Sequence, residues 1–199
     1  MTHILHYITN SIPYMLCAVP VWILIRIITN SLRKGRKINW LHEIGLLLFT
    51  MYCVGAASQT VIPKLEFGGS GLIVNGNLSG EINLIPSMVF ADIYRECIKN
   101  GYWSYFVINF IGNICLFLPI GFGLPLLWNR ITAGKTALIA LGVSLFIELG
   151  QLPQARGTDI DDLWLNVSGA LIGYLLYRLI IRIEKINSLC RKFKYSPKT

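Results

Sequence analysis

Five stretches of about 20 mainly apolar residues divide the sequence, and shorter polar segments with most of the charges separate them. A helix of that length crosses the hydrocarbon core of a bilayer and satisfies its own backbone hydrogen bonds, which an open strand or loop cannot do there. The stretches predict membrane-spanning helices at residues 12–30, 40–62, 103–128, 135–152 and 162–182. We therefore expect an all-α fold, a polytopic transmembrane helix bundle with about five spans.

The composition agrees with a membrane protein and leaves no room for a separate soluble domain. Hydrophobic residues make up 54% of the 199 residues and charged residues 14%, whereas soluble domains contain about 45–50% and about 25%. The net charge of +8 does not indicate a nucleic-acid partner, because the basic residues lie in the links between apolar stretches. None of the five cysteines forms a CxxC pair, so neither a zinc site nor a disulfide framework is indicated.

Lysine and arginine residues in the links predict the orientation of the chain in the membrane. Thirteen of them lie between the first and second spans, between the third and fourth spans, or from Arg178 onward. The other links hold only four basic residues against seven acidic ones. Because positively charged links favour the cytoplasmic side, we expect the N-terminus outside and the C-terminus in the cytoplasm.

The spans and links divide the chain into four segments. Residues 1–62 hold two N-terminal transmembrane helices and a basic cytoplasmic link, residues 63–102 an extracytoplasmic loop, residues 103–182 a three-helix core, and residues 183–199 a basic cytoplasmic tail. Turn signals in the loop predict a small hairpin. After Pro86, Ser87 is expected to cap a short amphipathic helix with Val89, Ile93 and Cys97 on one face.

Polar side chains in the last three spans, and in the link before the fifth, mark a candidate site. Polar groups inside a bilayer are costly and usually face the interior of the protein. From the helical rise, those in the spans fall in the outer half of the membrane, where three spans converge. The candidate binding residues are Asn113, Glu148, Gln151, Arg156, Asp159, Asp161, Asp162 and Asn166.

Three interpretations of these residues are open. They hold the helices together through hydrogen bonds, with Asp161 or Asp162 capping the fifth helix. Alternatively, they bind a polar head group at the outer leaflet while the spans hold the attached lipid. The third interpretation is acid catalysis, with Glu148 and Asp159 as the catalytic residues, or metal binding by the aspartates, although no EF-hand spacing is present.

The order of residues along the last three spans resembles a known family. The pattern comprises the run from Asn113 through Pro119 to Gly121, then Glu148, Gln151, Arg156, Asp159, Asp161, Asp162, Asn166, Gly169 and Gly173, preceded by the segment from Asn83 to Pro86. This ordered combination is similar to the signature of the VanZ-like family and covers residues 83–177. The resemblance implies a bacterial plasma-membrane protein. The family takes its name from a member that confers resistance to the glycopeptide antibiotic teicoplanin.

Three functions therefore compete. The leading hypothesis is a non-enzymatic protein that binds a lipid-linked cell-wall precursor or a lipoglycopeptide at the outer leaflet, with membrane lipids as further partners and no cofactor. The second is a membrane enzyme acting on a polyprenyl or glycolipid substrate, although His3, His6 and His42 all lie outside the pattern. The third is a membrane scaffold in which the polar residues serve helix assembly alone. No oligomeric state is predicted.

Overall fold

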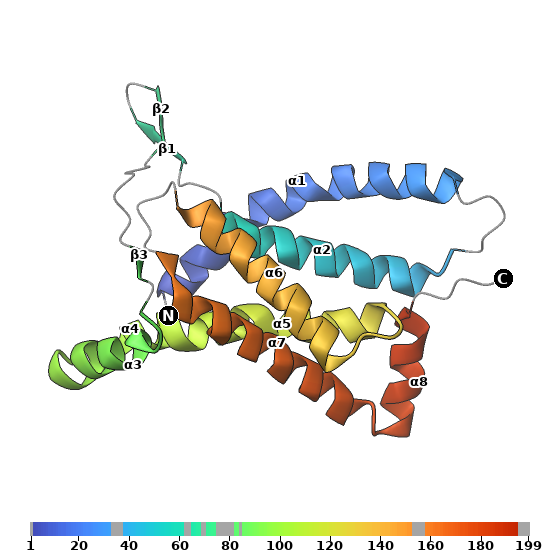
Figure 1. The fold of residues 1–199 in the computed structure, drawn as a ribbon. Coiled ribbons are helices and arrows are strands. Elements are labelled where there is room, and N and C mark those ends of the chain that lie inside the picture. The colour runs from blue at the N-terminus through green and yellow to red at the C-terminus, as the bar shows by residue number, and fades with distance from the viewer. Residues whose placement is uncertain are drawn as a thin grey trace.

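A computed structural model describes residues 2–32, 38–61, 65–68, 71–74, 82–83, 85–152 and 158–194 of the chain (Figure 1). It is a bundle of helices with five segments long and apolar enough to cross a membrane, which confirms the predicted fold class. These segments are Thr9–Leu32 within α1 (Thr2–Leu32), α2 (Trp40–Thr60), Trp103–Leu127, α6 (Ala133–Gln151) and α7 (Ile160–Ile180).

The limits of the spans agree with the predicted ones within a few residues, except at the first helix. That helix begins at Thr2, ten residues before the expected start, because apolar length was the criterion and the polar residues preceding the apolar stretch are also helical. The third span is one continuous helical segment made of α4 (Trp103–Tyr105), the π-helical turns η2 (Phe106–Ile111) and α5 (Gly112–Leu127).

The closest pairing in the bundle joins α5 to α7, and small residues make it possible. A Cβ atom on Gly169 would lie 2.2 Å from the carbonyl oxygen of Ile114, and one on Gly173 would lie 2.0 Å from that of Leu118. The two backbones are therefore in direct contact, as the GxxxG spacing in the last span indicates. Phe117 is fully buried beside this contact, in a core that α6 completes.

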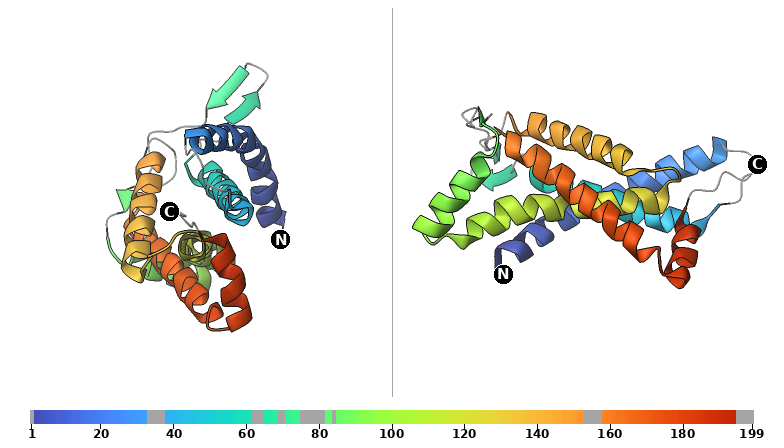
Figure 2. Two further views of the ribbon diagram at one scale, coloured as in Figure 1. Left: turned by 90° about the vertical axis from the view of Figure 1, so that its right-hand side faces the viewer. Right: turned by 60° about the horizontal axis from the view of Figure 1, so that its bottom comes forward.

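α1 is peripheral to this core. It packs along α2 on one side of the molecule, while α5, α6 and α7 gather on the other side, as the left view of Figure 2 shows. Many of its apolar side chains are exposed, Leu16 to 60% and Ile27 to 59%. In a membrane these side chains face lipid, which is as apolar as they are.

The connection between the second and third spans contains the expected hairpin and helix. β1 (Leu65–Gly68) pairs antiparallel with β2 (Gly71–Val74), and α3 (Met88–Ile93) continues into the π-helical segment η1 (Tyr94–Lys99). Val89 and Cys97 are buried, as the predicted apolar face requires. β3 (Ile82–Asn83) pairs in parallel with β4 (Thr158–Asp159), which brings the two long connections together.

The C-terminal part of the chain was expected to be a basic tail, and most of it is a helix. α8 (Glu184–Phe193) turns back across the end of the bundle against α2 and α5 (Figure 1). We call this end of the molecule, where α1 ends and α2 begins, the basic end. The opposite end, where α6 ends and α7 begins beside α3, is called the polar end.

Candidate functional site

The candidate site lies at the polar end, where the last turn of α6 meets β4 and the first turn of α7. Glu148 of α6 is 5% exposed, so its carboxylate lies inside the protein. One of its oxygens, Oε2, accepts a hydrogen bond from the backbone N–H of Asp159 at 3.3 Å. This bond ties the connection before α7 to α6.

Asp159 joins three elements of the polar end. Its Oδ1 accepts the backbone N–H of Asp161 at 2.9 Å, so Asp159 is the N-cap of α7. The helix-assembly interpretation predicts Asp161 or Asp162 as this cap, and on that point it is wrong. The other oxygen of Asp159 accepts a hydrogen bond from the side-chain amide of Asn83 at 3.3 Å, next to the pairing of β3 with β4.

Asp162 faces α5. Its Oδ1 accepts a hydrogen bond from the side-chain amide of Asn113, and both residues are partly buried. Glu148, Asp159 and Asp161 lie near enough to interact electrostatically with Asp162. The structure therefore brings the predicted carboxylates of α6, β4 and α7 into one cluster, with Asn113 of α5 beside it.

Asp161 faces a different way and anchors α3. Its Oδ1 accepts the backbone N–H of Ser87 at 2.7 Å and the indole N–H of Trp164 at 2.8 Å, and its Oδ2 accepts the backbone N–H of Val89 at 2.8 Å. The side chain of Ser87, which was expected to cap this helix, makes no capping bond, and its φ is 68°. Asp161 takes over that function from a distant part of the chain.

Two further predicted residues form bonds between helices. The side-chain amide of Gln151 donates to the carbonyl oxygen of Thr60 at 3.1 Å, which joins α6 to the end of α2. Asn166 is buried in α7 and donates to the hydroxyl of Ser144 in α6 at 2.8 Å. Its Oδ1 has no hydrogen-bond partner among the described residues. These positions fit the helix-assembly interpretation best.

Arg156, the predicted cation of the site, lies outside the described residues. Within the part of the chain that is described, no group of three or more His, Cys, Asp and Glu side chains is placed to hold a metal ion. The carboxylate oxygens of the aspartates do not converge on a common metal position, because those of Asp161 are directed at the start of α3.

Tyr105 belongs to the site, and the sequence analysis missed it. Its hydroxyl forms a hydrogen bond with Asp92, and it lies near enough to Asp159 and Asp162 to interact with them electrostatically. A signal was present in the sequence, because Tyr105 precedes Asn113 by eight residues, a spacing that places two residues on one helical face. Asn83 was also missed as a site residue, although its segment was part of the family pattern.

An apolar cavity of about 210 Å³ lies between α2, α5 and α6, and none of the carboxylates lines it. Ile147 lines it, directly before Glu148 in the chain. At the polar end, α2 and α6 are in close contact. A Cβ atom on Gly150 of α6 would lie 2.8 Å from the side chain of Val61, which directly follows α2. The carboxylate cluster and the apolar cavity are therefore neighbours on the same helix, α6.

Comparison with known proteins adds one finding. The sequence model of a family described as VanZ/LLP1 matches residues 44–182, which is more than half of the chain and includes every candidate site residue. The match begins in the second span, further toward the N-terminus than the residues that carry the resemblance in the sequence. No curated protein and no solved structure matches the chain.

Proposed function

The chain belongs to the VanZ/LLP1 family of integral membrane proteins, and we propose that it binds lipid-linked cell-envelope molecules at the outer leaflet of a bacterial plasma membrane. Teicoplanin resistance is the phenotype that we expect from such binding. The observation that carries the proposal is the cluster of Glu148, Asp159 and Asp162 together with an apolar cavity that Ile147 lines, directly before Glu148 in α6.

The chemistry of the cluster defines the head group that it suits. Carboxylates accept hydrogen bonds and attract cations, and they do so strongly where water is partly excluded. Asn113 and Tyr105 add side chains that donate as well as accept. A head group rich in amine, amide and hydroxyl donors, such as a peptide or an amino sugar, therefore fits this site. Because like charges repel, the phosphate that joins a polyprenyl chain to its head group lies away from the carboxylates in this proposal.

The apolar cavity supplies a place for the lipid part of such a ligand. A cavity of about 150 Å³ lined by apolar side chains stays dry and holds a benzene molecule. The cavity here is larger, at about 210 Å³, and apolar side chains such as Phe49, Leu116 and Phe146 line it. We propose that it takes a segment of the hydrocarbon chain while the head group remains at the carboxylates. Teicoplanin also carries an acyl chain.

Other members of the predicted site have a structural role in this proposal. Asp161, Gln151 and Asn166 use their side chains for bonds to α3, α2 and α6. A scaffold function, in which the whole cluster serves helix assembly, would extend that role to Glu148. Substitution of Glu148 distinguishes the two functions. If the protein is a scaffold, the variant yields less folded protein, whereas if the protein binds a ligand through Glu148, the variant folds but binds more weakly.

An enzymatic function is the second candidate, and the burial of Glu148 favours it. A buried carboxylate close to a second one is a frequent arrangement for acid and base catalysis. Glu148 and Asp159 would then act on a polyprenyl or glycolipid substrate. Turnover of such a lipid that disappears in a Glu148→Gln variant with unchanged binding would support the enzyme and contradict the binding protein.

Antibiotic susceptibility tests the proposal in cells. Cells expressing the protein are compared with cells expressing a Glu148→Gln, Arg156→Ala double variant at matched membrane levels, with teicoplanin and with vancomycin, which lacks the acyl chain. We expect protection against teicoplanin alone, and its loss in the double variant. The control is Glu184→Gln, which neutralises an exposed carboxylate on α8. Protection by neither form, or equal protection by both, would contradict the proposal.

A further inference from the structure

A second cavity, of about 500 Å³, lies at the basic end between α1 and α2. Its lining residues lie near the end of α1 and the start of α2, and this end of the bundle is opposite the end where α6 meets α7 (Figure 1). We propose that it binds the phosphate group of a membrane glycerophospholipid, with Arg26 as the phosphate ligand. The proposal is independent of the function assigned to the polar end, because α1 lies outside the region that matches the family.

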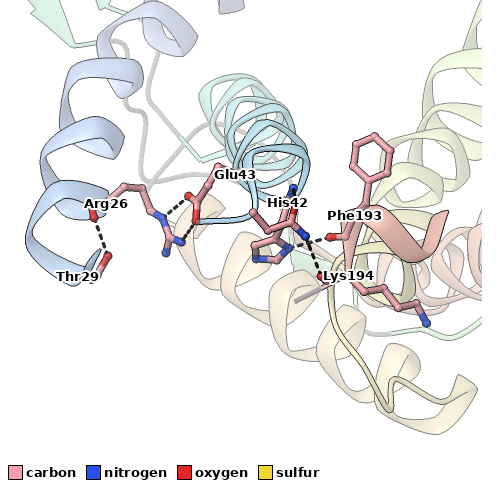
Figure 3. Close-up of polar contacts among 7 residues, drawn as sticks. Arg26, Thr29, His42, Glu43, Phe193 and Lys194 are labelled. Atoms are coloured by element: carbon pink, nitrogen blue, oxygen red, sulfur yellow. Dashed lines mark hydrogen bonds and ion pairs between the residues drawn. The ribbon is translucent and has the colours of Figure 1, made fainter. Parts of the chain in front are cut away.

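Arg26 is held in place by Glu43. Its Nε donates to Oε2 of Glu43 at 2.6 Å, and its Nη2 donates to Oε1, so the pair is bidentate. The two side chains are 16% and 12% exposed, and both line the cavity. Figure 3 shows the guanidinium group extending from α1 toward the first turn of α2. Glu43 thereby fixes the plane of the guanidinium group.

One edge of the guanidinium group is left for a ligand. Arginine has five N–H donors, and Glu43 engages only Nε and Nη2. Nη1 has no hydrogen-bond partner in the described part of the chain. Because Arg26 lines the cavity, its remaining N–H groups can donate to an acceptor that enters it. Phosphate oxygens match the fork of a guanidinium group in spacing and charge.

The other walls of the cavity suit the rest of a phospholipid. Trp22 and Asn30 lie four residues before and after Arg26, so the three share one stripe of α1, and all line the cavity. Asn30 adds a side-chain amide that can donate to a phosphate oxygen. Ile23 and Ile27 provide apolar contact for the acyl chains, and tryptophan residues are frequent at the interface where head groups lie.

The surroundings of the cavity favour an anion. It borders the first turn of α2, where Trp40 and Glu43 line it, and the N-terminus of a long helix carries a partial positive charge. The ion pair with Arg26 neutralises Glu43, so no unpaired carboxylate among the described residues lines the cavity. The described lining therefore lacks the unpaired carboxylates that would repel a phosphate diester at the polar end.

Native mass spectrometry of the full-length protein in detergent tests the proposal. The probes are phosphatidylglycerol, diacylglycerol with the same acyl chains, and inorganic phosphate. The variant is Arg26→Met with Glu43→Met, because replacing a buried ion pair by apolar residues of similar size leaves no unpaired charge and often preserves stability. We expect the variant to bind phosphatidylglycerol at least about tenfold more weakly, the loss typical of a charged hydrogen bond.

Arg178→Gln serves as the control, because it removes an exposed cation of α7 that does not line the cavity. It should bind phosphatidylglycerol as the unchanged protein does. Three results would overturn the proposal: equal affinity in the Arg26→Met, Glu43→Met variant with the fold retained, equal binding of diacylglycerol, or an equal loss in the control. Displacement of the lipid by inorganic phosphate at the same concentration would show that free phosphate, and not the phospholipid, is the occupant.

Discussion

At the scale of single residues, the carboxylates of the polar end have different environments despite their closeness in sequence. Asp161 accepts three N–H groups and is fully buried, whereas Asp162 accepts one hydrogen bond among the described residues, from the side-chain amide of Asn113. Asp159 caps α7. The residue with most of its acceptor directions in use is the one least suited to a ligand, so we assign Asp161 to stability and Asp162 to binding.

Asp161→Asn should lower stability without touching the proposed ligand contacts. The amide of asparagine would turn an N–H donor toward the backbone N–H of Ser87 or Val89, and the charge that strengthens these bonds would be lost. We expect a loss of about 3 kcal/mol or more, measured by unfolding in detergent with Trp164 fluorescence as a probe. Glu184→Gln should change stability little. Equal stability of Asp161→Asn and the unchanged protein would contradict the anchor role.

Part of this residue-level arrangement could be predicted from the sequence. Helical depth and spacing correctly grouped Asn113 with Asp162 and Glu148, because regular helices place polar groups at predictable heights. Two of the three partners of Asp161, Ser87 and Val89, could not be predicted, since they lie more than 70 residues away and depend on how the connections fold. Asn83 was missed for the same reason, because it meets Asp159 only through the pairing of β3 with β4.

At the scale of elements, the contact between α5 and α7 holds the site together. Asn113 and Asp162 meet across it, and the glycines of α7 allow the two backbones to touch. Any side chain at Gly173 must push α7 away from the carbonyl oxygen of Leu118, which is backbone and cannot rotate aside. The family pattern includes this glycine for a packing reason.

Gly173→Leu should therefore disrupt the bundle. We expect a destabilisation of at least about 1–3 kcal/mol, the range for overpacked cores, and a reduced yield of folded protein. Gly142→Leu is the matched control, because a Cβ atom at Gly142 of α6 would meet nothing within 4 Å. The measurement is thermal unfolding of both variants in detergent. Equal unfolding temperatures would contradict the close packing of α5 against α7.

α8 is the element that sequence patterns missed. Its last carbonyl groups are bound at the start of α2. His42 Nδ1 lies 2.8 Å from the carbonyl oxygen of Phe193 (Figure 3). The side-chain amide of Asn39, the N-cap residue of α2, donates to the carbonyl oxygen of Lys192 at 2.8 Å. The spacing of Ile186, Leu189 and Phe193 is amphipathic, but a short basic segment with this pattern is equally compatible with a free tail. Only the tertiary contacts with α2 decide between the two.

The thiol of Cys190 reports on this docking. Burial raises the pKa of the Cys190 thiol, although the ammonium group of Lys194 acts in the opposite direction. The test uses a protein in which Cys190 is the single cysteine. Because only the thiolate reacts, the rate of alkylation in the folded protein should increase at a higher pH than in the same protein unfolded in SDS. His42→Ala should loosen α8 and move the pH profile toward the unfolded one. Ser188→Ala, at an exposed position of α8, should not. Identical profiles in all forms would contradict the docking.

At the scale of the whole molecule, the two ends of the bundle have opposite chemistry. The polar end gathers carboxylates and faces outward in the proposed orientation, while the basic end holds the Arg26–Glu43 pair and α8. The number and type of spans follow from apolar length alone, and the structure confirms them. The sequence alone does not show which helices are neighbours or where the cavities lie, because side-chain packing determines both.

Direct binding of a polyprenyl-linked cell-wall precursor tests the central claim. The protein in nanodiscs is titrated with the labelled lipid, beside a Glu148→Gln, Asp162→Asn variant whose folding is checked by thermal unfolding, and beside Glu184→Gln. The account predicts saturable binding by the unchanged protein and by Glu184→Gln, and binding at least about tenfold weaker in the folded double variant. Saturable binding with equal affinity in all three, or no saturable binding by the unchanged protein, would contradict it.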